Sequence, residues 1–142
     1  MSRNVEHDIE IRELVARYGH AVSDRDADIW GGTWIEEAEW NVLGRSPRGR
    51  EDIVALWKQL MSRFPMIVHR ASDGIVRLEG DTATGTWAIV ENGQSETGEG
   101  VLVLGKYEDW YLHTGDGWRF KRRDFHCYYQ GAPDVTTPLP SG

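Results

Sequence analysis

The second half of the chain contains four long segments with strand-like composition, and this pattern constrains the fold most. The segments span residues 66–78, 82–91, 99–113 and 117–130. The sequences that separate them are Glu79-Gly80-Asp81, Asn92-Gly93 and Thr114-Gly115-Asp116-Gly117. Glycine beside Asn or Asp between two apolar runs is a strong hairpin signal. Consecutive strands joined by such turns predict an antiparallel meander.

The first half of the chain is dominated by helical periodicity. Between Val5 and Asp24, apolar residues recur on one face of an amphipathic helix, and they are Ile11, Leu14, Val15, Tyr18, Ala21 and Val22. A shorter helical stretch follows at 26–34, a strand pattern at 38–43, and a second amphipathic helix at 51–64 that ends at a proline. Helices that precede a sheet predict an α+β fold, here with the helices packed in the concave face of a strongly bent sheet.

Length, composition and charge limit the classes of function. The 142 residues fit one domain, with a core at about 5–130 and an extended tail at 131–142. The formal net charge of −7 argues against nucleic acid or an anionic membrane as a partner. No run of 18 apolar residues is present to span a membrane. The polar N-terminus carries no secretion signal, so we expect a cytoplasmic protein.

Histidine and cysteine spacing does not support a metal site. The histidines have no ligand spacing such as HExxH, and they lie at positions 7, 20, 69, 113 and 126. Cys127 stands alone, which excludes an internal disulfide and a cysteine-based metal site. No glycine-rich phosphate loop is present either. We therefore expect neither a metal nor another cofactor.

An ordered set of short sequences runs through residues 9–130. Its members are Leu14-Val-Ala-Arg17-Tyr18, Val22-Ser-Asp24, Glu36-Glu-Ala-Glu-Trp40, Arg48-Gly49-Arg-Glu51, Val68-His69, Gly80-Asp81, Lys106-Tyr107-Glu-Asp109 and Asp116-Gly-Trp118-Arg-Phe120. With the order of elements, this set resembles the NTF2-like superfamily and its SnoaL-like branch, especially the scytalone dehydratase and hexachlorocyclohexane dehydrochlorinase group. The resemblance implies a cone-shaped α+β fold and a homodimer or homotrimer. Fold alone does not give the reaction.

In that group, an Asp at the end of the first helix supports a His at the start of the long sheet. The resemblance places these roles on Asp24 and His69. A carboxylate bonded to one ring nitrogen fixes the tautomer and favours the imidazolium that forms when the other nitrogen takes a proton. From the residues alone, Asp24 is equally a polar helix-end residue, with Asp26 as the cap of the next helix, and His69 a hydrogen-bonded strand histidine.

Seven further residues are candidates for binding a small apolar ligand, and they are Tyr18, Trp40, Trp87, Tyr107, Asp109, Arg123 and His126. Trp40, Trp87 and Tyr107 are aromatic residues on predicted strands, and they would either form the walls of the cavity or belong to an ordinary core. The resemblance places Tyr18 where ketosteroid isomerases of the superfamily carry an oxyanion-donating tyrosine. Val42 occupies the position of the isomerase base, which disfavours isomerisation.

The last strand has two possible inward faces. Simple alternation places Trp118, Phe120, Arg122, Asp124 and His126 together. The resemblance places Arg123 near an arginine that receives the leaving anion in the dehydrochlorinase. Arg123 points inward only if a bulge precedes Phe125. Asp109 also has two interpretations. The resemblance places it near the second acid of the isomerase, and the residues alone allow an ion pair with Lys106 or Arg122 across the sheet.

These expectations together predict a cofactor-independent lyase that acts on a small apolar cyclic or aromatic compound. Proton removal by His69 would allow a hydroxyl or halide to depart. Two alternatives remain open. One is a non-catalytic protein that binds a hydrophobic ligand, and the other is the small subunit of a ring-hydroxylating dioxygenase, which needs a large iron-carrying partner chain. Contact between Asp24 and His69 beside an open cavity favours the enzyme, and separation favours the binder.

Overall fold

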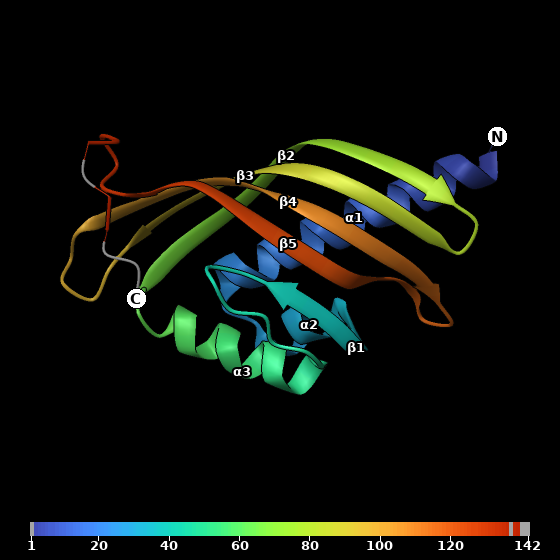
Figure 1. The fold of residues 1–142 in the computed structure, drawn as a ribbon, viewed down its shortest axis with the longest axis horizontal. Helices are drawn as coiled ribbons and strands as arrows, with labels where there is room; N and C mark the ends of the chain where they lie inside the picture. The colour runs from blue at the N-terminus through green and yellow to red at the C-terminus, as the bar shows by residue number, and fades with distance from the viewer. Residues whose placement is uncertain (1, 137, 140–142) are drawn as a thin grey trace.

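The computed structural model describes residues 2–136 and 138–139. Its elements are α1 (Ser2–Asp24), α2 (Ala27–Gly32), β1 (Trp34–Asn41), α3 (Arg50–Met61), β2 (Met66–Glu79), β3 (Thr82–Gln94), β4 (Gly100–Thr114) and β5 (Gly117–Gly131). Helix α1 crosses one face of a curved sheet, and α2 and α3 lie beside β1 at the edge (Figure 1). The predicted α+β fold with N-terminal helices on a curved sheet is confirmed.

The five strands form a single open sheet in the order β1-β5-β4-β3-β2. Strands β2 to β5 pair antiparallel, which confirms the meander, while β1 adds to β5 in parallel and makes the sheet mixed. The turn predicted at Asn92-Gly93 is wrong, because both residues lie within β3 and the chain turns at 95–99. A Cβ at Gly93 would lie 2.6 Å from the Met66 carbonyl oxygen, so the glycine permits close strand approach rather than a turn.

The helices bury the faces that their periodicity predicts. On α1, the side chains of Ile11, Leu14 and Tyr18 are at most 2% exposed. The Asp26 side chain accepts a hydrogen bond from the Ile29 backbone N–H at 3.0 Å and so caps α2. Both later helices are shorter than expected: α2 ends at Gly32 and α3 at Met61. The apolar faces of all three helices pack against the sheet in one core.

Two bulges in β5 change which side chains point into the concave face. Tyr111 pairs with Phe120 and Trp110 with Arg122, so Lys121 is an extra residue. Leu104 pairs with Tyr129 and Gly105 with Cys127, so Tyr128 is a second extra residue. A bulge shifts the alternation of side chains by one position. The side chains of β5 that point into the concave face are therefore those of even-numbered residues up to Phe120. From Arg123 they are those of odd-numbered residues, and at Gln130 they are even-numbered again.

Strand β2 carries a comparable irregularity. The pairing runs from His69–Glu91 to Ser72–Ala88 and resumes at Ile75–Thr86. Asp73 and Gly74 thus oppose a single residue of β3, and Asp73 has a positive φ of 55°. This bulge shifts the pairing register of the first half of β2 by one residue relative to β3. As a result, the residue opposite His69 is Glu91.

The predicted tail at 131–142 is described up to residue 136 and at 138–139, and the remaining residues lie outside the described part. Gly131 forms an antiparallel bridge with Pro138, and the Leu139 N–H donates to the Gln130 carbonyl at 2.8 Å. The described tail therefore folds back against the end of β5. Among the described residues, no helix is long and apolar enough to cross a bilayer.

Candidate functional site

A cavity of about 110 Å³ opens between α1, α3 and the concave face of the sheet. Most of its wall is apolar, with polar atoms supplied by a few side chains. The wall residues used below are Tyr18, Trp40, Leu43, Phe64, Glu91 and Tyr107. For scale, an apolar protein cavity of about 150 Å³ accommodates benzene. At about 110 Å³ the cavity of this protein is somewhat smaller, so the most that it could enclose is about one small ring or one end of a larger compound.

His69 is held by a carboxylate from the neighbouring strand. Its Nδ1 lies 2.8 Å from Glu91 Oε2, because the two residues are direct partners across β2 and β3. The backbone N–H of His69 donates to Ser23 Oγ at 3.1 Å, which ties this point of β2 to the end of α1. The imidazole side chain is 2% exposed and the Glu91 side chain 23%. Glu91, and not the imidazole, lines the cavity.

The hydrogen bond predicted between Asp24 and His69 is absent from the described residues. Asp24 is the exposed last residue of α1, and Nδ1 of His69 is occupied by Glu91 instead. Sequence reasoning missed Glu91. The only signal available was its place opposite His69 across a hairpin, and the bulge at 73–74 changes that register by one residue.

The Glu91 contact also sets the tautomer of His69. A carboxylate accepts hydrogen bonds, so the proton of this contact lies on Nδ1 of the imidazole. Among the described residues, Nε2 is buried without a hydrogen-bond partner. The ring edge packs against Gly19, where an added Cβ would lie 3.2 Å from Cδ2. His69 is thus a buried hydrogen-bond donor to Glu91.

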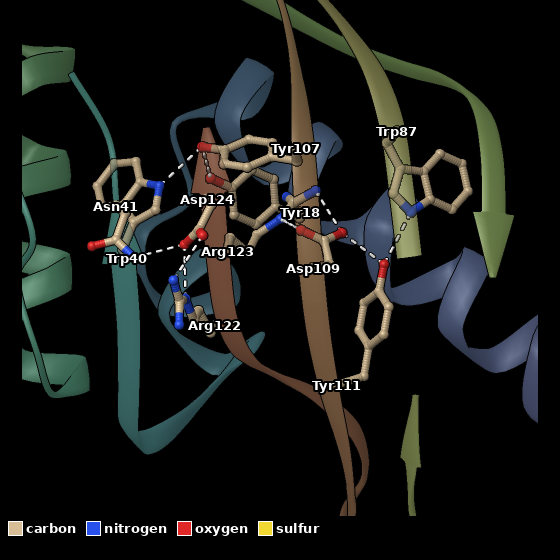
Figure 2. Close-up of polar contacts among 10 residues, drawn as sticks. All are labelled: Tyr18, Trp40, Asn41, Trp87, Tyr107, Asp109, Tyr111, Arg122, Arg123 and Asp124. Atoms are coloured by element: carbon tan, nitrogen blue, oxygen red, sulfur yellow. Dashed lines mark hydrogen bonds and ion pairs between the residues drawn. The ribbon is translucent and has the colours of Figure 1, made fainter. Parts of the chain in front are cut away.

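Tyr107 lines the cavity, and its hydroxyl group has two hydrogen-bonding partners. Trp40 Nε1 donates to the hydroxyl oxygen at 2.9 Å, and the Tyr18 hydroxyl lies 3.2 Å away (Figure 2). Burial raises the pKa of Tyr107 to about 12, against the Arg123 charge and the Tyr18 and Trp40 hydrogen bonds, which lower it. Burial also raises the pKa of Tyr18 well above its ordinary value. Both phenols are therefore protonated at physiological pH, and each can donate a hydrogen bond.

Arg123 points inward, as the Lys121 bulge requires, but it does not line the cavity. Its Nε and Nη2 donate to the two carboxylate oxygens of Asp109 at 2.7 and 3.1 Å (Figure 2). Its guanidinium carbon lies 3.8 Å from the ring centroid of Tyr107 and 4.4 Å from that of Tyr18. Arg123 thus acts on the cavity through the two tyrosine rings. The pairing of Asp109 with Lys106 or Arg122 is not formed.

The alternative inward set of β5 divides at the Lys121 bulge. Trp118 and Phe120 are buried in the core, whereas Arg122, Asp124 and His126 lie on the outer face of the sheet. Arg122 pairs with Asp124 at 2.9 Å, and His126 is 47% exposed beside Glu108. The prediction that His126 contacts the ligand therefore fails, for the same bulge turns it outward. Trp87 is buried but sits beyond the cavity, where its Nε1 donates to the Tyr111 hydroxyl at 3.0 Å. Of the seven predicted binding residues, Tyr18, Trp40 and Tyr107 line the cavity.

Two of the histidines that are distant in sequence meet at the other end of α1. His7, Glu10 and His113 offer ligand atoms within 4.8 Å of one another, about 22 Å along the helix from Val22. Trp118 Nε1 donates to His7 Nδ1 at 2.9 Å. Because an indole N–H only donates, neutral His7 carries its proton on Nε2. A metal ion bound at that nitrogen would have to displace the proton.

Comparison with known proteins identifies relatives of the whole fold. The profile of the SnoaL-like domain matches residues 3–124. An uncharacterized protein of Mycobacterium tuberculosis (strain ATCC 25618 / H37Rv) is 31% identical over 121 residues, covering 81% of each chain. A Novosphingobium aromaticivorans protein provisionally assigned as a scytalone dehydratase has a TM-score of 0.86 at 16% identity, covering 100% of this chain and 98% of its own.

A hexachlorocyclohexane dehydrochlorinase, LinA-type3 from Novosphingobium barchaimii LL02, has a similar fold. Its TM-score is 0.83 at 20% identity, and the match covers 98% of this chain and 94% of that one. At these identities the two solved structures show a shared fold alone. The profile match and the mycobacterial relative show the family as well, because they are matches of sequence over most of the chain.

Proposed function

The chain belongs to the SnoaL-like domain family, and we propose that it is a cofactor-independent lyase. It would eliminate a leaving group from a small, largely apolar cyclic or aromatic compound. The observation that carries the proposal is the His69–Glu91 pair, because Glu91 lines a largely apolar cavity that Tyr107 also lines. The dehydratase and dehydrochlorinase named among the structural relatives support this class of reaction.

In this mechanism, Glu91 is the base that faces the ligand. Its carboxylate takes a proton from carbon, and the electrons of the C–H bond form the new double bond. The leaving group departs with its bonding pair, and a departing oxygen accepts a hydrogen bond from Tyr107. His69 Nδ1–H holds the carboxylate in place throughout. This assignment moves the base from His69 to Glu91 and replaces Asp24 as the carboxylate that pairs with His69.

The aromatic and cationic residues behind Tyr107 favour negative charge at its hydroxyl. The hydroxyl oxygen accepts the Trp40 N–H, and the Arg123 guanidinium lies against the ring. Both interactions are in place before a ligand binds, so they need no reorganisation during the reaction. Charge that develops on a departing oxygen is thereby shared with Tyr107.

The test uses the ring opening of 5-nitrobenzisoxazole, an elimination that needs only a base. Removal of its C3 proton forms a nitrile while the N–O bond breaks, and the coloured 2-cyano-4-nitrophenolate is measured. We expect Glu91→Gln to lower kcat/KM by about 10²- to 10⁴-fold, the usual contribution of a general base. Glu108→Gln, on the outer face of β4, is the matched control and should leave the rate unchanged.

Asp24→Asn separates this mechanism from the one that the family resemblance implies. We expect the variant to open the ring at the wild-type rate, because Asp24 is exposed and makes no hydrogen bond with His69 in the described structure. Loss of activity in Asp24→Asn and in His69→Gln, with activity kept in Glu91→Gln, would overturn the role of Glu91.

A second candidate function is binding without turnover. Two observations favour it. Asp24 and His69 do not contact each other in the described structure, because Glu91 occupies Nδ1 of the imidazole. The imidazole itself is 2% exposed and does not line the cavity. A protein that binds phenol, measured by isothermal titration calorimetry, but does not accelerate ring opening of the benzisoxazole would belong to this class.

A further inference from the structure

The chain leaves β1 through a two-residue turn at the edge of the cavity. Val42 and Arg45 exchange two backbone hydrogen bonds, each 2.9 Å long. The residues between them, Leu43 and Gly44, have φ angles of 49° and 79°. Positive φ at both positions is the geometry of a type I′ turn, which favours Asn followed by Gly. Gly44 fits this preference, and Leu43 does not.

Leu43 combines backbone strain with a place in the cavity wall. Four described residues other than glycine have a positive φ, and they are Arg25, Leu43, Asp73 and Val135. A bulky side chain rarely adopts this region, because its Cβ approaches the backbone too closely. Of the four, Leu43 alone lines the cavity. Strain of this kind persists where the surrounding structure or a function requires the residue.

The Leu43 side chain is also unfavourably placed with respect to water. It is 48% exposed, although its immediate neighbour in the chain, Val42, is buried. Asn at this position would relieve the strain and be better solvated. The geometry of the turn therefore does not explain why a leucine stands at position 43. Contact with an apolar ligand would remove the exposed surface from water.

We propose that Leu43 is a specificity-determining residue that covers the apolar end of the bound ligand. The inference rests on the proposed function, because it assumes a small apolar ligand in this cavity. Tyr107 and Glu91, which supply a phenol and a carboxylate, line the same cavity. The ligand class that fits both ends is a single aromatic ring with one hydrogen-bonding oxygen, with the oxygen toward Tyr107 and the ring toward Leu43.

The test compares two variants by phenol binding and by thermal unfolding. Leu43→Ala keeps the strained backbone and removes most of the side chain, whereas Leu43→Asn removes both the strain and the apolar contact. We expect both variants to bind phenol about tenfold more weakly in isothermal titration calorimetry, since about two buried methylene groups are lost. We expect Leu43→Asn alone to unfold at a temperature about 3 °C above the wild type.

Val135→Asn is the matched control. Val135 has a φ of 60°, is 52% exposed and does not line the cavity. Its replacement should raise the unfolding temperature and leave phenol affinity unchanged. Wild-type affinity in Leu43→Ala and Leu43→Asn would overturn the role of Leu43 while leaving the proposed lyase intact. A wild-type protein that binds no phenol would overturn the ligand class, and the role of Leu43 with it.

Discussion

At the scale of single residues, the site depends on buried tyrosines that stay protonated. Tyr18 and Tyr107 have raised pKa values because burial disfavours the phenolate. Tyr111, which donates to Asp109 at 2.6 Å, has a raised pKa for the same reason. The Tyr111 hydroxyl binds Asp109 of the Arg123–Asp109 pair, and the guanidinium of that pair lies against the rings of Tyr18 and Tyr107 (Figure 2). Their protonation is therefore a condition for both the fold and the site.

This condition predicts a loss of stability at high pH. The pKa of Tyr107 is about 12 in the folded protein and about 10 in an unfolded chain. The unfolded state therefore loses its proton first, and raising the pH from 10 to 12 favours unfolding by about 1.4 kcal/mol per pH unit for each such tyrosine. Urea unfolding at pH 9, 10 and 11 measures the slope. Tyr107→Phe should reduce it, and an identical slope in that variant would contradict the assignment.

At the scale of elements, the bulges decide what the strands present to the cavity. Lys121 as an extra residue turns Arg123 and Phe125 inward, and Tyr128 as a second extra residue turns Gln130 inward. Phe125 and Gln130 both line the cavity. Without the two bulges, regular alternation from Phe120 would bring the Arg122, Asp124 and His126 set into the concave face. The bulges also bend the strand.

Close approach beneath the second bulge predicts a specific glycine requirement. A Cβ on Gly105 would lie 2.5 Å from the His126 carbonyl oxygen and 2.6 Å from the Phe125 ring. Gly105→Ala should therefore cost about 1 to 3 kcal/mol of unfolding free energy, as overpacking typically does. Gly115→Ala, in a turn with no atom within 4 Å of the added Cβ, is the control. Equal unfolding temperatures for the two variants would show that β5 shifts freely at this point.

At the scale of the whole molecule, one buried ion pair joins strands in the middle of the core. The Arg123 and Asp109 side chains are both 0% exposed. They connect β4 to β5, and the guanidinium packs on Tyr18 of α1. Burial raises the pKa of Asp109, against the Arg123 charge and hydrogen bonds. The pair holds the helix and the two strands that carry the site.

Removal of one partner would leave an uncompensated charge in the core. We expect Asp109→Asn to lower the unfolding free energy by about 3 to 5 kcal/mol, because Arg123 then has no counter-charge. Glu108→Gln, at the neighbouring position on the exposed face, should cost less than about 1 kcal/mol. Denaturant unfolding measures both values. A cost for Asp109→Asn no larger than that for Glu108→Gln would mean that Arg123 finds another partner or water.

The amino-acid sequence by itself determined the elements and their order. Periodicity located α1 and α3, turn residues located two of the three hairpins, and Asp26 was identified as a cap, because these features depend on neighbours in the chain. The resemblance added the family and the position of His69. Cytoplasmic location and a homodimer or homotrimer stay predictions.

Only the tertiary structure decided which side chains meet. Glu91 replaced Asp24 as the partner of His69 because a bulge at 73–74 shifts the register by one residue. Arg123 entered the core, and His126 left it, because a bulge at Lys121 reverses the alternation of β5. A one-residue shift exchanges the two faces of a strand, while its local sequence gives little sign of it. The partners and faces of the site residues were therefore beyond sequence patterns.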